Sequence, residues 1–126
     1  MRPTWRMREF RTLFVWQKAH RLALDVNVAM ETANSRRYTG LRSQIVRAAA
    51  SIPANIAEGC GKSTSREFAR YVEIAIGSAM ELDNHLLLAR DSAVIERQTY
   101  DDLAPRIAEV RRMSFSFLRA VRSRSD

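Results

Sequence analysis

The stretch TSREFARYVEIAIGSAMELDNHLLLARD, residues 64–91, decides the fold class. Its apolar residues recur at alternating steps of three and four, which is the spacing of one face of an α-helix. This core stripe consists of Phe68, Val72, Ala75, Ala79, Leu82, Leu86 and Ala89. Thr64 followed three positions later by Glu67 is typical of a helix N-terminus. The stretch therefore predicts a long amphipathic helix that packs against its neighbours at a shallow angle.

Three further segments carry the same periodicity. The first opens after Thr12, a candidate N-cap, and its stripe is Trp16, Ala19, Ala23, Val26, Met30 and Ala33. The second begins near Thr39 and carries Leu41, Ile45, Ala48, Ala49, Ile52 and Ile56. The last begins near Glu96 and carries Tyr100, Leu103, Ile107, Val110, Phe117 and Val121. Four helices of similar length with short connections predict an all-α, antiparallel up-and-down four-helix bundle. We expect residues 12–126 to form this single domain, and residues 1–11 to be a basic N-terminal extension.

Two prolines fall inside predicted helices. Pro53 has no N–H to donate to the carbonyl of Ala49, so we expect a kink or a local break there. Pro105 either bends the last helix early or marks its first turn. Asn55 and Glu58 place polar groups beside Pro53, and we expect them to satisfy the kink or an adjoining helix end.

The formal net charge of +7 is concentrated at the two ends of the chain. Residues 1–11 carry four Arg against one Glu, and residues 106–126 carry six Arg against one Glu and one Asp. Residues 12–105 sum to zero, with 11 basic and 11 acidic side chains. A partner attracted by charge is therefore expected to meet the termini first.

The composition also indicates the compartment. Cys60 is the single cysteine, so the chain has no internal disulfide and no need of an oxidising environment. Its apolar runs are far shorter than the roughly 18 residues of a membrane span. The Arg-rich start lacks the apolar stretch and cleavage site of a secretory signal. We expect a cytoplasmic protein with no membrane partner.

The string GCGKS, residues 59–63, resembles the end of a phosphate-binding P-loop. The P-loop requires another glycine five positions before Gly61, where this chain has Ile56, and it follows a strand rather than a helix. The glycines are expected instead to relieve a left-handed cap between two helices.

Di-iron bundles bind their metal through inward carboxylates and Glu-x-x-His pairs. The residues three positions before His20 and His85 are Gln17 and Leu82, so both pairs are missing. Glu81 and His85, four positions apart, predict a surface ion pair. We therefore predict a protein that is not an enzyme, with no catalytic residues, no metal site and no cofactor.

Two surfaces point to partners. Ile76, Met80 and Leu87 form a second apolar stripe, displaced by roughly 100° from the core stripe of residues 64–91. This is more apolar width than one core needs, and it predicts an oligomer interface. The alternative is a broad core with apolar edges.

The second surface is an arginine face on the last helix. Its members, which fall within roughly 100° of arc, are Arg111, Arg112, Phe115, Arg119 and Arg122. Arginines that surround an exposed aromatic ring can bind phosphates and stack on unpaired bases, so this face is a candidate nucleic-acid-binding site. The alternative is a solvated basic face with Phe115 buried against a neighbouring subunit.

Three strings resemble one protein family. They are LFVWQKAHRLA at 13–23, SIPANIAEG at 51–59, and the third segment with EFAR at 67–70 and LLLARD at 86–91. They are similar to the four-helix bundle proteins encoded by intervening sequences within bacterial 23S rRNA genes. The resemblance covers nearly the whole chain, and implies a ring-like homopentamer of uncharacterised role. Related bundle proteins accompany the reverse transcriptases of diversity-generating retroelements, where a basic pentamer engages RNA. The Arg-rich ends and Pro105 depart from the family's usual pattern.

These observations lead to two main hypotheses. The first is a non-enzymatic, homo-oligomeric protein that binds RNA through its basic surface. The second is a protein-interaction scaffold whose basic face docks an acidic protein without nucleic acid. A third and weaker one, an enzyme, would rest on Cys60 or on Asn55 and Glu58.

Overall fold

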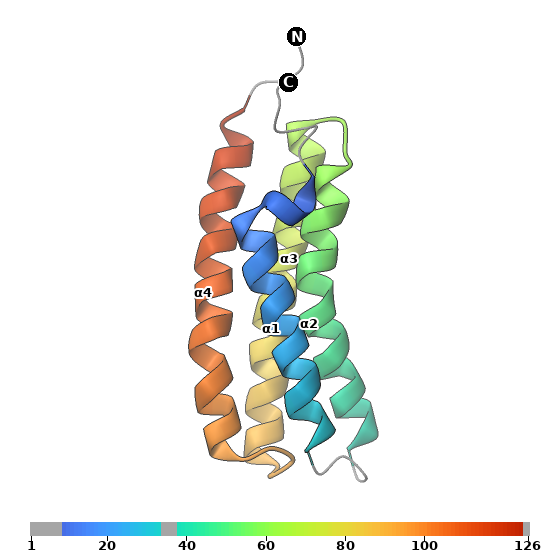
Figure 1. The fold of residues 1–126 in the computed structure, drawn as a ribbon, viewed down its shortest axis with the longest axis vertical. Helices are drawn as coiled ribbons and strands as arrows, with labels where there is room; N and C mark the ends of the chain where they lie inside the picture. Colours follow the sequence, from blue (N-terminus) through green and yellow to red (C-terminus); the bar gives the residue numbers. More distant parts are fainter. Residues whose placement is uncertain (1–8, 34–37, 125–126) are drawn as a thin grey trace.

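The structure, a computed structural model, describes residues 9–33 and 38–124. Four long helices run alternately up and down beside one another (Figure 1). They are α1 (Phe14–Glu31), α2 (Thr39–Cys60), α3 (Ser65–Asp91) and α4 (Arg97–Arg122), and a short 3-10 turn, η2 (Phe10–Thr12), precedes α1. The predicted all-α, antiparallel up-and-down bundle is confirmed. None of the helices in the described ranges is long and apolar enough to cross a membrane.

The core stripe of α3 is buried as predicted, and every one of its seven residues is at most 2% exposed. On α1 the buried residues include Val15 and Leu22, whereas the predicted Trp16 and Ala23 are half-buried at the edge of the core. Adjacent residues differ by 100° around a helix, so both sets fall within one wide apolar arc. The aliphatic residues point inward, and the Trp16 ring stacks on His20 at the surface, with ring centroids 4.6 Å apart.

The helix ends partly follow the sequence. Thr64 caps α3, because its side chain accepts a hydrogen bond from the Glu67 N–H at 3.2 Å. The prediction that Thr12 caps α1 is wrong. The Thr12 hydroxyl donates to the Glu9 carbonyl instead, at 2.7 Å, and Leu13 occupies the N-cap position.

The predicted left-handed glycine cap after α2 is also wrong. Gly61 has a φ of −85°, and no glycine in the described part of the chain has a positive φ. Gly59 is needed for a different reason, which is the close approach of α3. A Cβ atom at this position would lie 2.6 Å from Cδ1 of Phe68 and 3.2 Å from Cβ of Tyr71.

Both prolines lie inside continuous helices. α2 runs through Pro53 without a break, and α4 begins at Arg97, so the interpretation of Pro105 as a first turn is wrong. Beside Pro53, the Asn55 side-chain amide donates to the Ser51 carbonyl at 2.8 Å and to the Ser51 hydroxyl at 2.9 Å. The Asn55 amide thus bonds one turn back along α2, to Ser51 and not to Ala49, whose carbonyl is the one that Pro53 leaves without its helical donor.

The four helices do not pack equally closely. α2 and α3 make the most extensive contact, and α1 and α4 the least extensive among neighbouring pairs. The antiparallel order brings the beginning of α1, the turn between α2 and α3, and the end of α4 to one end of the bundle (Figure 1).

Candidate nucleic-acid interface

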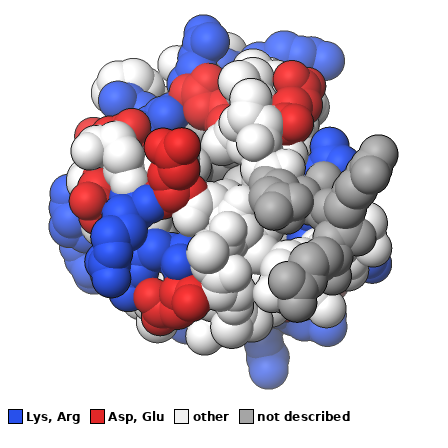
Figure 2. All heavy atoms as spheres, turned by 90° about the horizontal axis from the view of Figure 1, so that it is seen from below, with Lys and Arg blue, Asp and Glu red and all other residues white. Residues whose placement is uncertain are grey.

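The fold separates charge along the bundle axis. One half, made of residues 9–22, 50–78 and 110–124, carries eleven Lys or Arg against four Glu, a net charge of +7. The other half, made of residues 23–33, 38–49 and 79–109, carries five Arg against nine Asp or Glu, a net charge of −4. We call these the basic half and the acidic half. Seen from the end of the acidic half, Asp and Glu side chains lie beside Lys or Arg side chains and uncharged residues (Figure 2).

Summing the charge along the sequence conceals this separation. Residues 12–105 are neutral as a whole, but residues 79–109 carry three Arg against seven Asp or Glu. The excess positive charge of the described residues comes mainly from the end of α4, where residues 110–124 hold five Arg and no acidic residue. The beginning of α1 adds to it because it lies at the same end of the bundle.

All five residues of the predicted arginine face lie on the second half of α4, within the basic half. Phe115 is 44% exposed. Arg112 and Arg119 are exposed, and within the described ranges neither has a carboxylate at ion-pair distance. The Arg119 guanidinium donates to the Ser116 hydroxyl at 3.2 Å. An exposed ring between unpaired guanidinium groups is the arrangement that single-strand binders use.

The two other arginines of this face turn towards α3. Arg111 Nη1 lies 3.3 Å from the sulfur of Met80, and Arg122 Nη2 lies 3.1 Å from Oε2 of Glu73. The face therefore divides: among the described residues Arg112 and Arg119 have no carboxylate at ion-pair distance, whereas Arg122 is partly neutralised by Glu73.

The predicted oligomer stripe on α3 meets this face at the α3–α4 edge, through the contact between Met80 and Arg111. Met80 is 53% exposed and Leu87 is half-buried. Ile76 does not belong to an exposed stripe, because it is only 8% exposed and packs in the core of its own chain. The extra apolar width of α3 is thus partly used within the monomer, and Ile76 is removed from the candidate interface.

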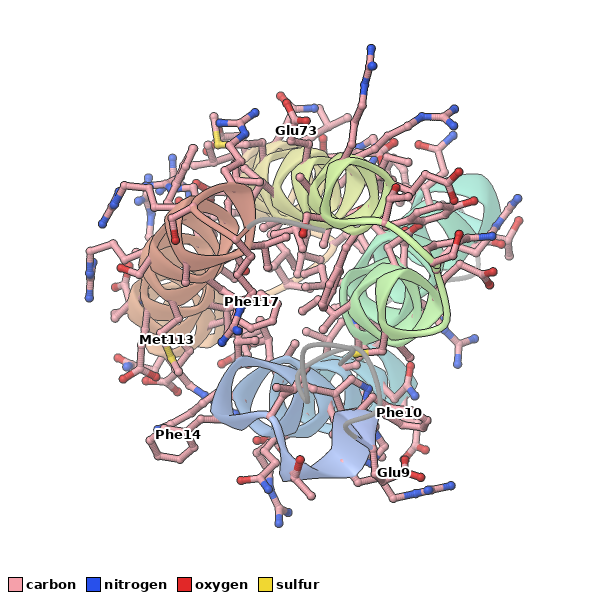
Figure 3. The ribbon with its side chains drawn as sticks, turned by 90° about the horizontal axis from the view of Figure 1, so that it is seen from above. Glu9, Phe10, Phe14, Glu73, Met113 and Phe117 are labelled. Atoms are coloured by element: carbon pink, nitrogen blue, oxygen red, sulfur yellow. The ribbon has the colours of Figure 1, made fainter. Side chains whose placement is uncertain are left out.

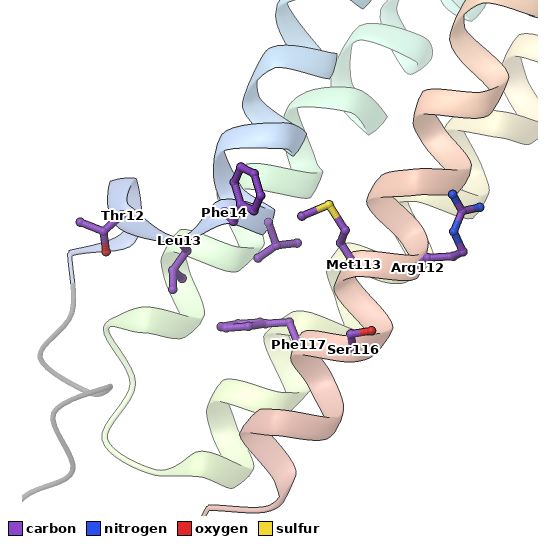
Figure 4. A pocket seen from close by; sticks show the side chains of 8 residues that line it. Thr12, Leu13, Phe14, Arg112, Met113, Ser116 and Phe117 are labelled. Carbon is purple, nitrogen blue, oxygen red and sulfur yellow. The ribbon is translucent and has the colours of Figure 1, made fainter.

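Sequence reasoning missed a cleft between the beginning of α1 and the end of α4 (Figure 4). Its lining is formed by Thr12, Leu13, Phe14, Val15, Arg112, Met113, Ser116 and Phe117. Phe14 is 67% exposed, whereas Phe117 points into the bundle and meets Phe68 edge-on, with ring centroids 5.4 Å apart (Figure 3). Phe14 lies outside the α1 core stripe. A large aromatic residue off the core stripe was the sequence signal that could have indicated a cleft or contact surface here.

Lys62 and Tyr71 add to the basic half near the turn between α2 and α3. The Lys62 ammonium lies 5.0 Å from the centre of the Tyr71 ring and 3.4 Å from Oε2 of Glu58. The Coulombic interaction with Tyr71, followed by the hydrogen bond to Glu58, raises the pKa of Lys62. Lys62 is therefore fully charged at neutral pH. Glu58 is exposed in the last turn of α2, where it pairs with Lys62.

The described residues contain no group of three or more His, Cys, Asp or Glu side chains that could hold a metal ion. His85 Nε2 lies 3.4 Å from Oε2 of Glu81, which is the predicted ion-pair geometry when the imidazole is protonated. Cys60 is buried at the end of α2.

Comparison with known proteins agrees with the resemblance of the sequence strings at 13–23, 51–59 and 67–91 and with the four-helix fold. Residues 11–116 match the family described as 23S rRNA-intervening sequence protein. The chain belongs to this family. A crystal structure of a protein with unknown function from the S23 ribosomal protein family of Bacteroides thetaiotaomicron is also similar. The two chains are 25% identical with a TM-score of 0.76, over 82% of this chain and 97% of that one. No curated protein matches.

The family match also delimits what the family can explain. It ends at residue 116 and therefore includes Arg111, Arg112 and Phe115. Arg119 and Arg122 lie beyond the matched residues.

Proposed function

We propose that this member of the family is a non-enzymatic, cytoplasmic RNA-binding protein that uses the basic half of its bundle. The observation that carries the proposal is the segregation of charge, +7 in one half of the described residues and −4 in the other. Clustered Arg and Lys supply the sequence-independent part of nucleic-acid affinity, because they replace the counterions of the phosphate backbone. The acidic half would repel the same backbone, so the charge pattern orients the protein on RNA.

The arginine face offers distinct contacts for phosphate and base. Arg112 and Arg119 would contact phosphates, since neither is neutralised by a carboxylate among the described residues. Phe115, 44% exposed between them, offers a ring on which an unpaired base can stack. This combination favours single-stranded RNA over a duplex, whose bases are already stacked on one another.

Fluorescence anisotropy with a labelled single-stranded RNA of about 15 nucleotides tests the proposal. The variant Arg112→Glu/Arg119→Glu should lose at least ~10-fold in affinity and show a shallower dependence on salt. The matched control is Arg47→Glu/Arg97→Glu, which makes the same change in net charge at exposed positions of the acidic half. The control should lose much less affinity.

Two results would contradict the proposal. The absence of measurable binding at about 50 mM salt, where phosphate contacts are strongest, would contradict RNA binding itself. An equal loss in the two double variants would show that only net charge matters, and would contradict the assignment of the site to the arginine face. A specific acidic protein retained by the wild type after nuclease treatment, and lost in Arg112→Glu/Arg119→Glu, would favour the scaffold alternative.

We further propose that the chain acts as a homo-oligomer, for which the family resemblance implies five subunits. Its support in the structure is the number of large apolar side chains left exposed on a single chain. Apart from Phe115, which is assigned to the RNA site, they are Phe14, Leu24, Val28, Ile74, Met80 and Leu88. Where such side chains form a contiguous patch, this exposure is typical of a surface that a partner covers. Light scattering should report a multiple of 14.4 kDa, and a monomer at micromolar concentration would contradict the proposal.

A further inference from the structure

We propose that a cleft between the beginning of α3 and the end of α4 binds a phosphate of the RNA backbone, and that Glu73 competes with this phosphate for Arg122. The inference rests on the RNA-binding function proposed above. It adds the residues that receive the backbone and the residue that limits its affinity.

The cleft has a volume of about 430 Å³. Its lining is formed by Ser65, Arg66, Ala69, Glu73, Arg122 and Arg124. Its charged side chains are Arg66 and Glu73 on α3, Arg122 in the last turn of α4, and Arg124 just beyond that helix. Guanidinium groups bind phosphate oxygens in a planar, two-pronged geometry, so phosphate is the ligand that this set of side chains fits.

The contact between Arg122 and Glu73 determines how strongly the cleft can act. Nη2 of Arg122 lies 3.1 Å from Oε2 of Glu73, and the two side chains are 54% and 53% exposed. A half-exposed ion pair of this kind contributes little to stability, because solvent screens it. A phosphate can therefore displace the Glu73 carboxylate without unfolding the bundle. Until it does so, Glu73 occupies donors that the phosphate needs.

The position of the cleft links it to the arginine face. Arg122 follows Arg119 by three positions on α4, so both side chains lie on one face of the helix. A strand whose base stacks on Phe115 would reach the cleft by running along α4 towards its end. The arrangement makes the α3–α4 cleft the continuation of the site proposed for Arg112, Phe115 and Arg119.

The test compares two neutralising changes in α3 by anisotropy with the same single-stranded RNA. Glu73→Gln removes the carboxylate beside Arg122. Glu67→Gln removes an exposed carboxylate from the same end of α3 that has no ion-pair partner among the described residues. We expect Glu73→Gln to raise the affinity about fivefold, as one charge-assisted contact becomes available to the phosphate. The log–log salt slope should steepen by about 0.7, the value for one additional phosphate contact on a single strand. Glu67→Gln should change the affinity by less than about twofold, because its charge is farther from the cleft and screened by solvent.

A double-mutant cycle assigns the effect to the pair. In an Arg122→Gln background, Glu73→Gln should no longer raise the affinity by more than about twofold, because the competing pair is already gone. Circular dichroism should show every variant folded. Equal effects of Glu73→Gln and Glu67→Gln, or an undiminished effect in the Arg122→Gln background, would overturn the inference and leave RNA binding intact.

A second probe separates failure of the cleft from failure of RNA binding. Inorganic triphosphate, followed by NMR, should shift the signals of Arg66 and Arg122, and Glu73→Gln should bind it more tightly than the wild type. If triphosphate binds in this way but single-stranded RNA does not bind, the cleft is an anion site and the proposed RNA function is contradicted. The absence of shifts at both residues would overturn the cleft.

Discussion

The α2–α3 and α1–α4 seams are built in opposite ways. At the close seam, Gly59 lets α3 approach so closely that Phe68 and Tyr71 fill the space that a Cβ atom at position 59 would occupy. The hydroxyls of Ser51 on α2 and Ser78 on α3 form a hydrogen bond of 2.8 Å across the same seam. The loose α1–α4 seam is bridged by exposed ion pairs, and its end opens into the cleft beside Phe14. Small residues produce a close, rigid contact, whereas long and aromatic side chains hold helices apart. The proposed RNA site lies on α4, the helix that borders the loose seam.

The largest effect is expected from closing the space at Gly59. Gly59→Ala places a Cβ atom 2.6 Å from Cδ1 of Phe68, a buried ring that packs against Phe117 and has little room to move. Overpacking should exceed the gain in helix propensity and lower the free energy of unfolding by about 2 kcal/mol. Urea unfolding measures the change. A stability equal to or above that of the wild type would contradict the close seam.

The next effect concerns the hydroxyl pair of the close seam. Ser78→Ala removes one partner of the Ser51–Ser78 hydrogen bond, and Ser78 is only 8% exposed. The expected loss is about 1 kcal/mol, the usual net value of a hydrogen bond in a protein. Ser116→Ala is the matched control, since this hydroxyl is exposed on α4 and, among the described residues, its side-chain hydrogen bond comes from Arg119. Equal losses for the two variants would show that the seam does not exclude water.

A helical glycine outside the seam should respond in the opposite direction. Gly77 lies within α3, and a Cβ atom built there would have no neighbour within 4 Å. Gly77→Ala is therefore expected to raise the free energy of unfolding by about 0.5 to 1 kcal/mol, through helix propensity alone. The same denaturation experiment compares it directly with Gly59→Ala. A loss of stability would show that α3 is packed more tightly at Gly77 than the structure indicates.

The smallest effect is expected at the loose seam. Arg106 Nη1 and Asp25 Oδ2 are 2.7 Å apart, but the side chains are 37% and 42% exposed. Asp25→Asn should cost about 0.5 kcal/mol, and most of this difference should disappear in about 1 M salt. Unfolding at low and high salt provides the measurement. A loss above about 2 kcal/mol that salt does not change would mean that the pair is desolvated.

The sequence predicted the helices more accurately than their ends. The α3 core stripe and the Thr64 cap are local features, and both are present in the structure. The left-handed backbone conformation that was predicted for a glycine after α2 is found instead at Ala93, after α3, with a φ of 59°. The N–H groups of Ala93 and Val94 bond back to Arg90 and Ala89, which closes the helix end despite the cost of this backbone conformation.

The sequence predicted the arginine face of α4 and the second apolar stripe of α3 as two separate surfaces, without the contacts between them. Arg111, Arg112, Phe115, Arg119 and Arg122 share a face of α4 because helix geometry alone places them there. That Arg122 meets Glu73, that Arg111 meets Met80 and that Ile76 turns inward could not be derived from spacing. These contacts depend on how far α3 and α4 rotate and slide against each other.

The sequence by itself determined four amphipathic helices and their core stripes, because the period of an α-helix relates neighbouring residues wherever the helix lies. Only the tertiary structure decided the close and loose seams, the position of Phe14 in a cleft and the division into a basic and an acidic half. These features arise between segments far apart in the chain. Their geometry is set by the packing of the whole core rather than by any one helix.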